Sequence, residues 1–66
     1  MDLTLICTGK TEHSYKGHHT YTLEFSNTED IQDGILDATF HLETSNPELV
    51  ERYRINESYV FHFPDP

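Results

Sequence analysis

Hydrophobic and polar residues alternate along three separate stretches of this chain, a pattern that predicts β-strands. The first stretch covers residues 3–8, and the clearest covers residues 18–25, where His19, Tyr21, Leu23 and Phe25 share one face. Turn-forming residues at 14–17 separate these two strands and predict a hairpin. The third stretch has its apolar residues on one face at Leu36, Ala38, Phe40 and Leu42.

The remaining segments predict a loop, a short helix and a closing strand. Residues 26–34 are polar and rich in turn formers, which indicates a loop. A helix is predicted over residues 47–54, because Ser45 or Asn46 can cap it and Pro47 suits its first position. In the predicted final strand, Tyr59, Phe61 and Phe63 alternate with Val60 and His62.

The order of these elements predicts one mainly β (α+β) domain spanning residues 1–66. A three-strand meander followed by a helix and another strand resembles the OB-fold, a small β-barrel with its helix between the third and fourth strands. The fifth strand of that barrel is absent here or reduced to residues 63–66. We therefore predict either a small OB-like β-β-β-α-β barrel or a four-stranded antiparallel sheet with one short helix at about 47–54.

The charge balance narrows the class of partner. The chain has 12 acidic and four basic residues, a formal net charge of -8, and no Lys or Arg between Gly17 and Glu51. Nucleic-acid binding draws much of its affinity from Lys and Arg, and anionic membranes attract the same residues, so both partners are disfavoured. The expected partner is a protein with a basic surface. The first residues read as neither a signal peptide nor a membrane span, which indicates a cytoplasmic protein.

Two groups of residues are candidates for contacting that partner. The densest acidic group comprises Glu29, Asp30, Asp33 and Asp37. Its spacing does not match a calcium-binding loop, and solvated loop carboxylates need no catalytic role, so we predict an acidic interaction surface and no enzyme activity. The second candidate is a contact anchor at the hairpin tip, formed by Tyr15 and Lys16.

Histidine and cysteine are the remaining residues with candidate chemistry. The strand phases place His18, His41 and His62 on the outward face, where imidazoles beside carboxylates suit zinc or nickel. Their spacing matches no zinc signature, so exposed strand histidines are the default interpretation and no cofactor is predicted. Because an unperturbed histidine has a pKa of about 6.5, the five histidines predict that the protein loses much of its negative charge in mildly acidic conditions. Cys7 shares a face with Leu3 and Leu5, which predicts a buried core residue rather than a nucleophile.

The segments 40–49 and 59–64 give the chain a resemblance to the very small accessory proteins encoded by phages. That resemblance implies a virion component or a host-directed binding protein, in the host cytoplasm or the virion, and carries over no catalytic residue. The leading hypothesis is a non-enzymatic interaction module whose acidic surface mimics nucleic acid. The alternatives are a small structural subunit that forms a homo-oligomer and a single-stranded nucleic-acid-binding protein with an OB-like face.

Overall fold

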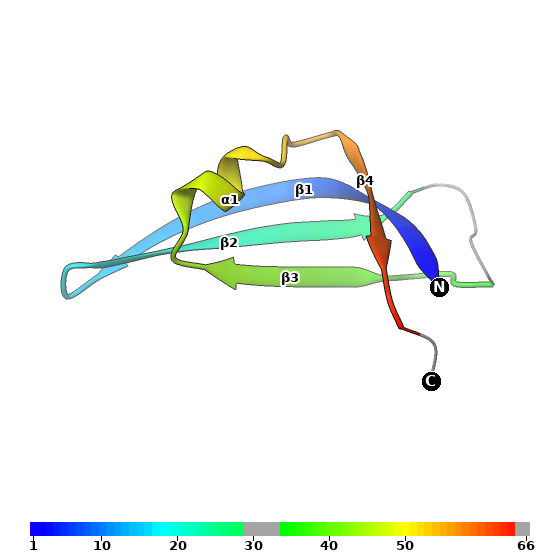
Figure 1. Ribbon diagram of the computed structural model, residues 1–66, viewed down its shortest axis with the longest axis horizontal. Helices are drawn as coiled ribbons and strands as arrows, with labels where there is room; N and C mark the ends of the chain where they lie inside the picture. The colour runs from blue at the N-terminus through cyan, green and yellow to red at the C-terminus, as the bar shows by residue number, and fades with distance from the viewer. Residues whose placement is uncertain (29–33, 65–66) are drawn as a thin grey trace.

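The computed structural model describes residues 1–28 and 34–64, which form one antiparallel sheet and a short helix (Figure 1). The elements in chain order are β1 (Asp2–Tyr15), β2 (His18–Asn27), β3 (Thr39–Thr44), α1 (Pro47–Glu51) and β4 (Ser58–His62). The four strands lie in the order β3-β2-β1-β4. The predicted mainly β fold is therefore confirmed, and of the two alternatives the described residues adopt the open four-stranded sheet, with β3 and β4 at its edges.

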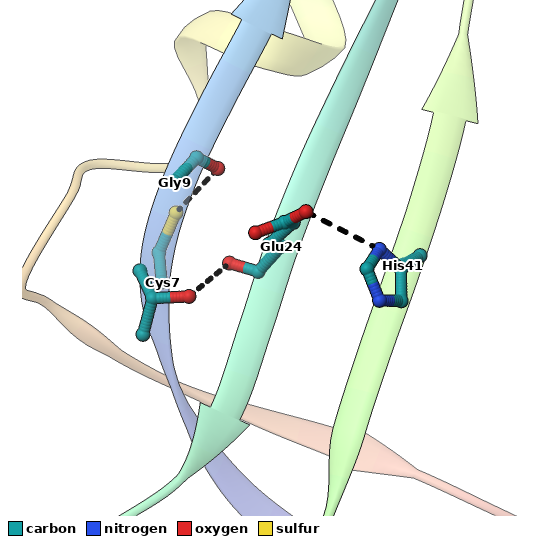
Figure 2. A network of polar contacts seen from close by, with 5 residues as sticks. Cys7, Gly9, Glu24 and His41 are labelled. Carbon is teal, nitrogen blue, oxygen red and sulfur yellow. Dashed lines mark hydrogen bonds and ion pairs between the residues drawn. The ribbon is translucent and has the colours of Figure 1, made fainter.

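A bulge in β1 gives the sheet its shape. The register between β1 and β2 shifts between Cys7 and Gly9, so Thr8 is an extra residue in β1. Its hydroxyl donates a hydrogen bond to the Glu24 carbonyl at 3.3 Å, one of the contacts drawn in Figure 2. Because bulges bend a strand, β1 turns at this point and its first half, paired with β4, leads β4 across β2 and β3 (Figure 1).

The core lies between the main sheet and the crossing β4. Its fully buried residues come from β1 and β2 alone: Leu3, Leu5, Cys7, Leu23 and Phe25. The centre of the Phe25 ring lies 5.2 Å from that of Tyr53 and 4.9 Å from that of Phe61, and both of these rings are edge-on to it. The prediction that Cys7 is a buried core residue is confirmed, and its thiol is free.

A half-buried shell surrounds this small core. Among the described residues, nine apolar ones pack against it without being fully covered: Ile35, Ala38, Phe40, Leu42, Val50, Tyr53, Tyr59, Phe61 and Phe63. Most of the large side chains of the cluster therefore keep part of their surface in water.

Three element boundaries differ from the sequence prediction. β1 continues to Tyr15, because its polar second half pairs with β2 to form a hairpin that extends beyond β3 (Figure 1). The helix ends at Glu51 instead of residue 54, and the chain after it turns through Asn56 at a φ of 73°. Leu36, predicted to face inward, is 76% exposed.

The side chain of Asn27 explains why Leu36 lies outside the third strand. Its Nδ2 donates to the Leu36 carbonyl at 3.2 Å, and its Oδ1 accepts from the Ala38 N–H at 3.3 Å. The Asn27 side chain thus binds this segment beside the backbone bond from the Asn27 N–H to the Ala38 carbonyl, and β3 begins only at Thr39.

Candidate interaction surface

The exposed face of β2 and β3, on the side away from the core, carries the candidate site. Directly opposed residues on neighbouring antiparallel strands share a face, and here Glu24 opposes His41 while Thr22 opposes Glu43. All of these side chains except Thr22 are exposed. Figure 2 shows the Glu24 carboxylate on β2 directed at the His41 ring on β3, with 3.6 Å between Oε1 and Nδ1.

The elements next to this surface carry negative charge without fixed positive charge. The elements β2, β3 and α1 contain no Lys or Arg, and their carboxylates are all exposed: Glu24, Glu43, Glu48 and Glu51. The bases lie elsewhere, at Lys10 on β1, Lys16 in the hairpin turn, and Arg52 and Arg54 after the helix. We call Glu24 and Glu43 the β2–β3 carboxylates.

The contacts of the β2–β3 carboxylates add little to the stability of the fold. They are diagonal neighbours on one face, so their mutual effect is repulsive. Glu24 contacts the exposed imidazole of His41, and exposed pairs of this kind contribute little to stability. Their main physical effect is the electrostatic field they set up in the surrounding solvent.

The acidic residues singled out in the sequence are only partly covered by the structure. Asp37 is exposed in the segment that leads into β3. Glu29, Asp30 and Asp33 lie outside the described residues, so the structure does not place them relative to Asp37. Sequence reasoning missed Glu24 and Glu43, because it ranked acids by density along the chain, whereas these two come together only through the β2–β3 register.

The three outward histidines lie on three different strand pairings. His18 opposes Tyr15 in the hairpin, His41 opposes Glu24, and His62 opposes Asp2. Within residues 1–28 and 34–64 no group of three or more His, Cys, Asp or Glu side chains is arranged to hold a metal ion.

Carboxylates accompany two of these histidines and a third one on the hairpin. The pairs are His41 with Glu24, His62 with Asp2 at 2.6 Å and His19 with Glu12 at 3.3 Å. The hydrogen bond to His62 lowers the pKa of Asp2 below its ordinary value. Each pair bridges two neighbouring strands on the surface.

The predicted contact anchor lies at the tip of the β1–β2 hairpin. Tyr15 is 71% exposed, and the Lys16 ammonium lies 5.3 Å from the centre of its ring. Lys16 and Gly17 both have positive φ, 50° and 81°, as a two-residue type I′ turn requires. The tip therefore displays a tyrosine ring partly shielded by its own lysine, far along the hairpin from the β2–β3 carboxylates.

No family model, curated protein or solved structure matches this chain. The described part of the chain contains no helix with the length and apolar character needed to cross a membrane. A functional proposal therefore rests on the surface chemistry described above.

Proposed function

We propose that this protein is a non-enzymatic interaction module that binds a basic surface of a partner protein. The observation that carries the proposal is the charge distribution on β2, β3 and α1. These elements combine exposed carboxylates with a complete lack of Lys and Arg. A partner with clustered Lys or Arg would be attracted to these elements, and the field would raise the association rate and the selectivity.

The most specific form of the proposal is a nucleic-acid mimic. Glu29, Asp30, Asp33 and Asp37 would add their charge to the β2–β3 carboxylates and occupy a groove that otherwise binds phosphates. A phage-encoded accessory protein acting on a host factor in the cytoplasm is the biological setting we propose for such a mimic, in line with the resemblance of segments 40–49 and 59–64.

A salt-dependent capture experiment tests the proposal. Tagged protein is incubated with host-type lysate, washed at low or high salt, and the retained proteins are identified by mass spectrometry. We expect a basic protein to be retained at low salt and released at high salt, because screening weakens attraction between exposed charges. Retention of the same proteins at both salt concentrations would contradict an electrostatic interaction.

A pair of matched variants then locates the binding surface. The double variant Glu24→Lys/Glu43→Lys reverses the β2–β3 carboxylates, and Glu12→Lys/Glu57→Lys makes the same change in net charge at exposed positions elsewhere. The first should weaken capture about tenfold or more, and the second only slightly, if the charges act locally. Equal losses would show that total charge matters and that this surface does not.

A structural subunit is a second candidate, favoured by the open sheet. β3 and β4 are both edge strands, and edge strands are templates for pairing with another chain. This alternative predicts a stable oligomer in light scattering that is insensitive to salt, whereas the interaction module remains monomeric without its partner.

A further inference from the structure

The edge of β3 that faces away from β2 pairs with no other strand among residues 1–28 and 34–64, and it presents a defined row of backbone groups. Just beyond the last pair of the β2–β3 ladder, Ser26 with Thr39, the Asn27 N–H donates to the Ala38 carbonyl at 3.0 Å, so the backbone groups of Asn27 and Ala38 face each other between the two strands. Hydrogen-bonded and non-hydrogen-bonded pairs alternate along an antiparallel ladder, and the register continues without a shift to Thr44. The N–H and C=O groups of Thr39, His41 and Glu43 therefore point away from β2, along the sheet edge.

On the core side of this edge lies apolar surface that the fold covers only in part. Phe40 projects from β3 to the core side, where its ring centre is 5.5 Å from that of Phe61 and 6.5 Å from that of Phe63. All three rings are half-buried. Phe61 of β4 and Phe63 just after it thus contact Phe40 of the edge strand β3, and each of the three residues keeps part of its surface exposed.

On the opposite side of the same edge lies the acidic surface. His41 and Glu43 project outward from β3, and Glu24 lies beyond them on β2. An added strand would place alternate side chains on the two sides of the sheet, since successive side chains in a strand point to opposite faces. One set would contact the phenylalanine rings, and the other would lie beside the β2–β3 carboxylates.

From these three features we infer that β3 is a docking edge for an extended partner segment in which apolar residues alternate with Lys or Arg. The segment adds to the sheet as a fifth strand through the outward backbone groups of Thr39, His41 and Glu43, by β-strand addition. This inference rests on the proposed function, because it specifies how the basic partner binds.

A second copy of the chain fits this edge less well than such a segment. The chain's own alternation of basic and apolar residues is Arg52-Tyr53-Arg54-Ile55, but Tyr53 packs edge-on against Phe25 in the core. Pairing β3 with β3 of another copy would bring together two surfaces that lack Lys and Arg. Charge therefore selects a basic partner over self-association.

The test uses synthetic peptides as probes. A fluorescently labelled peptide of alternating valine and lysine should bind at low salt, and the valine–glutamate peptide should not. Two further peptides carry backbone N-methyl groups on every valine or on every lysine. Because the N–H groups that face β3 belong to alternate residues, methylation of one set should weaken binding about tenfold or more, and methylation of the other set should not.

A variant of β3 tests the same contact from the protein side. His41→Pro removes an N–H that points away from β2, so the β2–β3 ladder is kept, and proline is tolerated on an edge strand in this position. His41→Ala is the matched control, since it removes the imidazole and keeps the N–H. We expect His41→Pro to weaken binding of the valine–lysine peptide about tenfold and His41→Ala less than about twofold, with the fold of both checked by circular dichroism.

The outcomes separate this inference from the proposed function. Polylysine, which binds by charge without strand pairing, is the reference probe. Suppose that polylysine binds in a salt-sensitive way, but that neither set of N-methyl groups nor His41→Pro weakens binding of the valine–lysine peptide. That result would overturn strand addition and would still support the interaction module. Lack of polylysine binding at low salt would overturn the interaction module itself. Self-association with the β3 amides protected from hydrogen exchange would show that a second copy occupies the edge, which also overturns the inference.

Discussion

Replacing Phe25 should have the largest effect of any single substitution in the core. Phe25 is fully buried, and its ring contacts four others, those of Phe40, Tyr53, Tyr59 and Phe61, at centre distances between 4.9 and 6.5 Å. Phe25 of β2 therefore contacts rings from β3, from the helix-to-β4 connection and from β4.

The expected magnitude follows from burial and from these ring contacts. Phe→Ala in a protein core lowers the free energy of unfolding by about 3–5 kcal/mol. A domain of this size has a total of only about 3–5 kcal/mol, so Phe25→Ala should be largely unfolded in water. Phe25→Leu keeps much of the volume but loses the edge-on ring contacts, and it should lower the free energy of unfolding by about 1–2 kcal/mol.

Urea titration followed by far-ultraviolet circular dichroism measures both effects, with tyrosine fluorescence as a second probe because the chain has no tryptophan. Phe63→Leu is the matched control, since Phe63 is half-buried and its one described ring contact is to Phe40. It should lower the free energy of unfolding by less than about 1 kcal/mol. A Phe25→Leu variant no less stable than Phe63→Leu would refute the central place of Phe25 in the core.

Four further substitutions test local features. Gly17→Ala should destabilise the fold by about 1–2 kcal/mol, because φ is 81° at this position. Gly9→Ala should change stability by less than about 0.5 kcal/mol, since the nearest atom to the new Cβ would lie at 3.5 Å, and urea titration compares the two variants. Asn27→Ala should cost about 1–2 kcal/mol by freeing the segment before β3, visible as faster amide exchange there. The pKa of Asp2 is lowered from 3.8 in the folded state, so ionised Asp2 stabilises the fold above pH 3.8 and this stabilisation disappears as the pH falls through the folded-state pKa. Asp2→Asn should remove the corresponding part of the acid dependence of stability.

The features that could be predicted from the sequence are those fixed by burial on one face. The phases of β2 and β4 follow from Tyr21-Leu23-Phe25 and Tyr59-Phe61-Phe63, because a shift of one residue would expose every one of these side chains. The sequence also predicts a cap for α1 at Ser45 or Asn46, and in the structure the Asn46 side chain accepts a hydrogen bond of 3.0 Å from the Glu48 N–H.

The features that could not be predicted depend on contacts between distant residues. The second half of β1 is held by backbone pairing with β2 and carries no apolar pattern that would reveal a strand. Asp2 and His62 are 60 residues apart, and only the β1–β4 register brings them together. The candidate surface has the same origin, since Glu24 and Glu43 belong to one face only once β2 and β3 are paired.

The placement of charge connects the open sheet with the proposed binding. Natural proteins protect exposed sheet edges with charged residues, bulges or proline, because an unprotected edge pairs with other chains. On β3 the protection comes from Glu43, with Glu24 beside it on β2, and no Lys or Arg balances these carboxylates on either strand. Protection of this kind is selective, because it opposes pairing with another acidic chain, including a second copy, and favours a basic one. In the proposed binding, the same carboxylates would oppose self-association through β3 and favour a basic segment packed against Phe40, Phe61 and Phe63.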